Sequence, residues 1–182
     1  SDQVELDRAE TIWVGQDFNA GLISAVIGQA RGDELYVTDE LVTRTHIHDH
    51  VRALQAFFER RGIDWRRRVN VCIDASGEYN ATNRVQTDAV IMRKAGFRTR
   101  HSMHNPAVID RIHTVQALIL NSEGRRRLHI NERCSELINC LLNQTYNQWH
   151  KPDKTRGLDH LPDALGYLAW ELFPIVPQGT IE

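Results

Sequence analysis

Residues that could bind a metal ion gather near the C-terminus of this 182-residue chain. Asp159, His160 and Asp163 lie within one five-residue window. Pro162 is tolerated only near the start of a helix, because the N–H that proline lacks would have no partner there in any case. A carboxylate in the first helical turn is favoured in its ionised form by the helix dipole, which suits a hard divalent cation. Asp159 also has the residue type of a helix N-cap, so the stretch needs carboxylate partners from elsewhere.

An apolar stripe predicts the helix that carries these residues. Five leucines recur at spacings of three and four residues, which marks one apolar helix face: Leu158, Leu161, Leu165, Leu168 and Leu172. Asp163 lies off this stripe, and His160 comes one turn before it.

Two further aspartates end apolar strands. Asp17 closes a predicted strand over residues 11–19, and Asp74 closes another over residues 68–74. In open α/β sheets, sites collect at the carboxyl ends of strands. Three carboxylates brought together with Asp163 would repel one another unless cations lay between them, and Mg²⁺ or Mn²⁺ is the natural occupant. Two such ions about 4 Å apart can activate a water and stabilise the leaving oxygen in phosphodiester hydrolysis.

The rest of the chain predicts a mixed α/β sheet that would position these side chains. Short turns join the first three strands into an antiparallel meander, and helices then alternate with further strands. The predicted strands are residues 11–19, 22–30, 35–42, 68–74 and 97–102, with a short extended piece at 128–130. The predicted helices are residues 45–61, 83–95, 106–120 and 134–142, followed by the leucine-striped helix.

The helix at 106–120 is expected to bury its apolar side chains, which are Val108, Ile109, Ile112, Val115 and Ile119. Residues 144–156 show no clear period and predict a long excursion next to the aspartate-rich helix. Three basic residues of this excursion, Lys151, Lys154 and Arg156, are candidates for holding DNA phosphates.

Bulk properties narrow the class of protein without identifying it. A 41% hydrophobic and 25% charged composition is ordinary for a globular domain, and 182 residues suit one domain with a proper core. The net charge of −2 neither favours nor excludes nucleic acid, since an acidic metal site cancels basic residues in the sum. Cys72, Cys134 and Cys140 lack the spacing of a zinc site and predict buried free thiols.

Four segments together carry a resemblance to a known family. They are Val-Gly-Gln-Asp-Phe-Asn at 14–19, Cys-Ile-Asp-Ala-Ser-Gly at 72–77, Asn-Pro-Ala-Val-Ile-Asp-Arg-Ile at 105–112, and Asp-His-Leu-Pro-Asp-Ala-Leu-Gly-Tyr at 159–167. In this order they resemble the nuclease domain of tailed-phage large terminases. The resemblance runs from about Trp13 to Trp170 and so covers nearly the whole chain.

The resemblance implies a single ribonuclease H-like nuclease domain over residues 1–182, with a mixed central sheet of three antiparallel strands followed by parallel strands, flanked by helices. It also implies an endonuclease that cuts concatemeric double-stranded DNA during genome packaging, with two divalent cations, Mg²⁺ or Mn²⁺. Asp17, Asp74 and Asp163 match the metal-binding acidic triad. His160 matches a position that joins the metal shell in some relatives, while Asp159 is the weaker candidate and leans toward a cap.

Partners and location are also implied by the resemblance. They are double-stranded DNA, the terminase ATPase domain, the small terminase subunit and the portal protein, in the cytoplasm of the infected bacterial host. No GxxxxGK[ST] phosphate-binding loop occurs in the sequence, so this chain is not expected to hydrolyse ATP itself. The chain begins at Ser1, which suggests a piece cut from a longer protein.

Two alternatives stay open at this stage. One is another nuclease of the ribonuclease H-like group, such as a junction resolvase or a transposase. The other is a docking module that binds DNA or the portal without cutting. A preference for four-way junctions would favour the first, and the absence of any metal effect on stability would favour the second.

Overall fold

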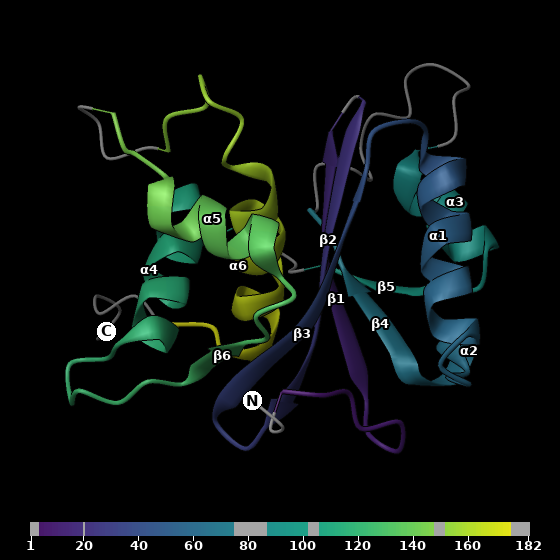
Figure 1. The fold of residues 1–182 in the computed structure, drawn as a ribbon, viewed down its shortest axis with the longest axis horizontal. Helices are drawn as coiled ribbons and strands as arrows, with labels where there is room; N and C mark the ends of the chain where they lie inside the picture. The colour runs from purple at the N-terminus through teal and green to yellow at the C-terminus, as the bar shows by residue number, and fades with distance from the viewer. Residues whose placement is uncertain (1–3, 20, 75–86, 102–105, 148–151, 176–182) are drawn as a thin grey trace, which may run out of the picture.

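The computed structural model describes residues 4–19, 21–74, 87–101, 106–147 and 152–175. Within them, six strands form one mixed sheet in the order β5-β4-β1-β2-β3-β6 (Figure 1). The first three strands pair antiparallel, β4 and β5 continue in parallel beside β1, and β6 runs parallel to β3. The predicted mixed sheet is confirmed. The strands are β1 (Ile12–Asn19), β2 (Leu22–Arg31), β3 (Glu34–Thr43), β4 (Val69–Cys72), β5 (Arg98–Arg100) and β6 (Leu128–Ile130).

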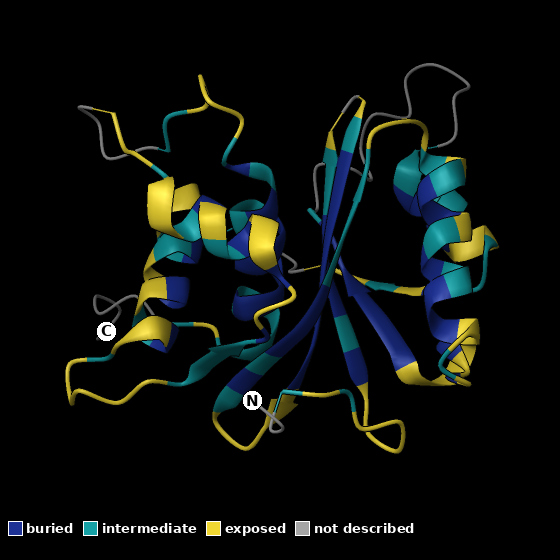
Figure 2. Cartoon of the chain, in the orientation of Figure 1, coloured by how far each residue is buried: buried dark blue, intermediate teal, exposed yellow. Residues whose placement is uncertain are grey.

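Helices cover both faces of this sheet, and each face has its own hydrophobic core (Figures 1 and 2). One face carries α1 (Ile47–Glu59), α2 (Trp65–Arg68) and α3 (Asp88–Lys94). The other face carries α4 (Val108–Ile119), α5 (Ser135–Asn143) and α6 (His160–Leu172).

Strand β1 supplies side chains to both cores, because successive residues of a strand point to opposite faces. Ile12 and Val14 belong to the core under α1. Trp13 packs with the core under α6, and Gly15 faces α6 directly. Asp17 follows this odd-numbered series and therefore points to the α6 side of the sheet.

Helix α4 is oriented differently from the sequence prediction. Val108, Ile109 and Ile119 were expected inside but are 39%, 39% and 44% exposed. The helix instead buries Arg111 and Thr114, together with Val115 and Leu118, which face inward. The rotation is possible because the buried charge of Arg111 meets an aspartate on α6, described below. Apolar side chains are thereby left near the surface.

Other departures from prediction are small. Helix α2 was not predicted, and the described part of the helix expected at 83–95 is α3, the residues before 87 lying outside the described ranges. The strand expected at 68–74 is hydrogen-bonded only over β4, so that Asp74 lies two residues beyond its end. The three cysteines are free and buried, as predicted. None of the described helices is both long and apolar enough to cross a membrane.

Gly15 allows α6 to lie directly against β1. A Cβ atom at this position would stand 2.0 Å from the carbonyl oxygen of Ala164 and 2.8 Å from Cβ of Leu168. Real side chains do not approach so closely, so any residue larger than glycine would push α6 away. Because Asp17 is two residues from Gly15 and Asp163 is next to Ala164, this contact also sets the spacing of the two aspartates.

We therefore expect Gly15→Ala to lower the free energy of unfolding by about 3 kcal/mol, since the added methyl group meets backbone that cannot yield. Urea denaturation measures this loss. Gly32→Ala is the matched control. Its φ of +63° makes the substitution cost about 1 kcal/mol, but nothing lies within 4 Å of the new methyl group. Equal losses in the two variants would show that the β1–α6 contact is not tight.

A candidate acidic site between β1 and α6

Asp17 meets the start of α6 through His160. Its Oδ2 atom lies 3.1 Å from Nδ1 of His160, and Nδ2 of Asn19 lies 3.0 Å from the same ring nitrogen. The pKa of Asp17 is raised to about 6. Burial is the largest cause, and the negative charge of Asp163 is the next, while contact with His160 opposes both. An ionised Asp17 is therefore held at a cost in free energy.

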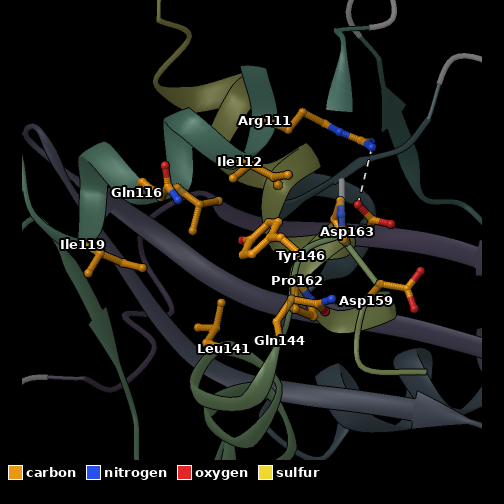
Figure 3. A pocket seen from close by; sticks show the side chains of 13 residues that line it. Arg111, Ile112, Gln116, Ile119, Leu141, Gln144, Tyr146, Asp159, Pro162 and Asp163 are labelled. Carbon is orange, nitrogen blue, oxygen red and sulfur yellow. Dashed lines mark hydrogen bonds and ion pairs between the residues drawn. The ribbon is translucent and has the colours of Figure 1, made fainter. Parts of the chain in front are cut away.

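Asp163 is paired with the buried Arg111 of α4 (Figure 3). Nη2 of Arg111 lies 3.4 Å from Oδ1 of Asp163, and the two side chains are only 7% and 19% exposed. The guanidinium also stacks over Tyr167, 4.0 Å from the centre of its ring. Burial raises the pKa of Asp163, and the positive charges of Arg111 and Lys154 oppose that rise. Arg111 thus keeps a buried carboxylate closer to its ionised form.

Asp159 lies at the N-cap position of α6, but its side chain does not cap the helix. The expected capping role is wrong, because the carboxylate is turned toward a lysine instead. Its Oδ2 atom lies 3.1 Å from Nζ of Lys154, which is also 4.0 Å from Oδ2 of Asp163. The pKa of Lys154 is raised, first by its hydrogen bond to Asp159 and then by the charges of Asp159, Asp163 and Asp17.

Asp74 stands beside Asp17 at the sheet edge. Gly15 pairs with Cys72 across the parallel β1–β4 ladder, and each aspartate lies two residues farther along its chain. Asp74 is partly buried, and its charge contributes to the raised pKa of Tyr167 on α6. Both aspartates therefore leave the sheet at the same end, toward the start of α6.

The remaining predicted site residues have different positions. Lys151 lies outside the described residues, and Arg156 is exposed in the loop before α6. Lys154 was predicted to bind DNA, yet it points at Asp159 and Asp163. Sequence reasoning gave no role to Arg111 or Asn19. The only signal for Arg111 was its place in the family-like segment at 105–112, since an arginine on a helix is usually at the surface.

The donor atoms of the site suit a hard divalent cation, although their arrangement is not that of a loaded site. Among the described residues, no group of three His, Cys, Asp or Glu side chains is arranged to hold a metal ion. The carboxylates instead face His160, Arg111 and Lys154. Oδ1 of Asp159 is buried and has no hydrogen-bond partner among the described residues. Carboxylate oxygens with raised pKa values and one unused buried oxygen fit Mg²⁺ or Mn²⁺ chemically.

A sequence profile of the terminase RNase H-like domain matches residues 4–171. This chain belongs to that family. No curated protein matches the chain. Among solved structures, a large terminase from a thermophilic bacteriophage superimposes with a TM-score of 0.69 at 17% identity, over 90% of this chain and 40% of that one. The chain thus spans about two fifths of that large terminase.

Two isolated terminase domains are also similar. The nuclease domain of the P22 large terminase gives a TM-score of 0.66 at 17% identity, covering 90% of this chain and 81% of that one. The nuclease domain of the large terminase from bacteriophage SPP1, solved with bound Mn, gives 0.58 at 18% identity, covering 90% and 86%. At these identities the similarity concerns the fold, and it confirms the predicted ribonuclease H-like architecture.

The raised pKa of Asp17 makes the stability of this terminase domain depend on pH. The folded state holds the Asp17 proton more tightly than the unfolded chain, so its stabilising effect is complete below about pH 4 and is lost as the pH rises through about 6. At pH 7.5 in EDTA, Asp17→Asn should therefore unfold with a free energy about 3 kcal/mol higher than the wild type. Urea denaturation at several pH values measures this gain, which should shrink toward pH 4.

Asp33→Asn is the control for that measurement, because Asp33 lies half-exposed in the β2–β3 turn. It should gain no stability at pH 7.5. An Asp17→Asn variant that is no more stable than this control would show that Asp17 bears no electrostatic cost.

Removing Arg111 should be far more damaging than breaking a surface ion pair of the same length. Arg111→Met leaves Asp163 buried without its closest positive partner, so the free energy of unfolding should fall by about 3 kcal/mol. Arg44 and Glu136 also lie 3.4 Å apart, but both are more than half exposed, and Arg44→Met should change stability by less than about 0.5 kcal/mol. Similar losses in the two variants, measured by urea denaturation, would contradict the role given to Arg111.

Proposed function

We propose that this chain is the nuclease domain of a phage large terminase and hydrolyses phosphodiester bonds of double-stranded DNA during genome packaging. One observation carries the proposal. In a domain of the terminase RNase H-like family, buried carboxylates from β1 and α6 converge closely enough for Asp163 to raise the pKa of Asp17. Related terminase nuclease domains have been solved with bound Mn, in SPP1, and with bound magnesium, in the thermophilic phage G20c.

The proposed ligands are Asp17, Asp74 and Asp163, with His160 beside them. Asp159 joins them on the strength of its buried, unpartnered oxygen, although its sequence alone favoured a cap. The proposed cofactors are two divalent cations, Mg²⁺ or Mn²⁺. When bound, such a pair supplies an activated water and neutralises the charge that develops on the leaving 3′-oxygen.

Protein side chains prepare this site in three ways. Arg111 holds Asp163 ionised and fixed against Tyr167. His160 lies between two carboxylates, with Nδ1 3.1 Å from Asp17 and Nε2 4.0 Å from Asp159, and so limits the positions that Asp17 can adopt. Lys154 neutralises Asp159 and Asp163 in the absence of metal. Its side chain is 69% exposed, so it can turn outward to a DNA phosphate once cations carry that charge.

DNA binding is proposed to depend on the phosphate backbone, which explains cutting without sequence preference. Lys154 and Arg156 flank the acidic site in the loop before α6, and Lys151 belongs to the same loop. The partners proposed beyond DNA are the terminase ATPase domain, the small terminase subunit and the portal protein, with action in the cytoplasm of the infected bacterial host. The similar large terminase, of which this chain spans about two fifths, supports a further part of that kind.

The decisive test is cleavage of supercoiled plasmid with Mn²⁺. Asp74→Asn should fold normally and lose activity at least about 100-fold, because a ligand is removed from the site. Asp17→Asn and Asp163→Asn should behave alike. Asp33→Asn, which alters an exposed turn carboxylate, should cut as the wild type does.

Full cutting by Asp74→Asn would sink the assignment of the ligands. A wild-type domain that binds plasmid but shows no cutting in any metal would instead indicate a docking module. Preference for four-way junctions over linear duplex would indicate a resolvase-like nuclease on the same fold.

A further inference from the structure

A hollow of about 250 Å³ opens beside the acidic site, between α4, the end of α5 and the start of α6 (Figure 3). Asp159 and Asp163 line it at one end, and Gln116 and Ile119 line it at the other. Pockets for drug-sized ligands are usually roughly 300–1,000 Å³, so this one suits a smaller group. Because it shares Asp159 and Asp163 with the acidic site, whatever enters it lies next to the proposed scissile phosphate.

The walls of this hollow, which we call the α4–α6 pocket, are mainly apolar. Ile112, Val115, Leu141 and Pro162 contribute to them. Tyr146 adds an aromatic ring that is 48% exposed. The rotation of α4 that buries Arg111 is what turns Ile112 and Ile119 toward this space. Apolar walls with one accessible aromatic ring suit a flat heterocycle, since every nucleobase offers a face that can stack.

Unsatisfied polar atoms also gather around the pocket. Nε and Nη1 of Arg111, Oε1 of Gln144 and Oδ1 of Asp159 are buried, and none has a hydrogen-bond partner among the described residues. All three residues line the pocket. Native proteins seldom leave such groups unpaired, so their concentration around one hollow indicates a bound group that supplies donors and acceptors. The edge of a base carries both.

We propose that the α4–α6 pocket receives one unstacked base of the DNA strand being cut, next to the scissile phosphate. The inference rests on the proposed nuclease function and deepens it. An anion is excluded as the occupant, because Asp159 and Asp163 would repel it, and a base pair is too large for the space. Leaving the duplex costs a base least where it is mismatched or already unpaired. The enzyme should therefore prefer to cut beside such bases.

The test uses a short oligonucleotide with a single 2-aminopurine, a fluorescent base analogue that reports stacking. It is supplied as a single strand, as a mismatched duplex and as a perfect duplex, with Ca²⁺ to fill oxygen ligands. Wild-type protein should change the fluorescence of the first two far more than that of the third. Tyr146→Ala removes the exposed ring, and Gln116→Trp fills the pocket from its exposed rim. Both should abolish the signal and weaken binding of the single strand about tenfold.

Leu142→Ala is the matched control, because Leu142 is 79% exposed and lies outside the pocket. It should bind as the wild type does. All three variants should still nick plasmid, but Tyr146→Ala and Gln116→Trp should lose the preference for cutting beside mismatches.

A wild-type protein that cuts DNA yet gives the same fluorescence with all three substrates would overturn the pocket assignment and leave the nuclease function standing. Unchanged binding in both pocket variants would do the same. A wild type that neither binds these oligonucleotides nor cuts plasmid would overturn both.

Discussion

Asp17 and Asp163 come from opposite ends of the chain, and their negative charges are forced together where α6 lies on β1. The contact is possible because residue 15 is a glycine, whose missing Cβ leaves the Ala164 carbonyl room to touch the strand. The free energy gained by burying the leucine face of α6 holds the two carboxylates in place against their repulsion. The acidic site is thus a strained feature supported by the core beneath it, as is common where function requires an arrangement that folding alone would not favour.

Two basic side chains relieve this repulsion in different ways. Arg111 is buried, stacked on Tyr167 and confined beside Gly166, where a Cβ would stand 3.3 Å from its own Cβ. It is a permanent partner of Asp163. Lys154 is mostly exposed and reaches the carboxylates from a loop, so little packing resists its departure. A divalent cation can replace an exposed ammonium far more easily than a buried guanidinium, which makes Lys154 the group that would exchange with metal.

The sequence was sufficient to predict the sheet and much of the candidate site. The apolar strands, the turn residues between them and the leucine stripe of α6 each follow from local period, and Asp17 and Asp163 lie at the ends of such elements. Period shows which side chains share a face, but not which face packs inward. The ion pair with Asp163 decided that for α4, turning Arg111 in and Ile119 out. Asp159 had the residue type and position of a cap, and only its tertiary contact with Lys154 reveals another role.

The central claim is that the carboxylates between β1 and α6 bind divalent cations. Titration with Mn²⁺, followed by electron paramagnetic resonance of the free ion, measures the number of ions bound and their affinity directly. The wild type should bind two ions per chain, and Asp163→Asn should bind fewer and more weakly. Lys154→Met should bind Mn²⁺ more tightly than the wild type, because its competing charge is gone. A wild type that binds no ions, or an Asp163→Asn variant that binds two with unchanged affinity, would contradict the claim.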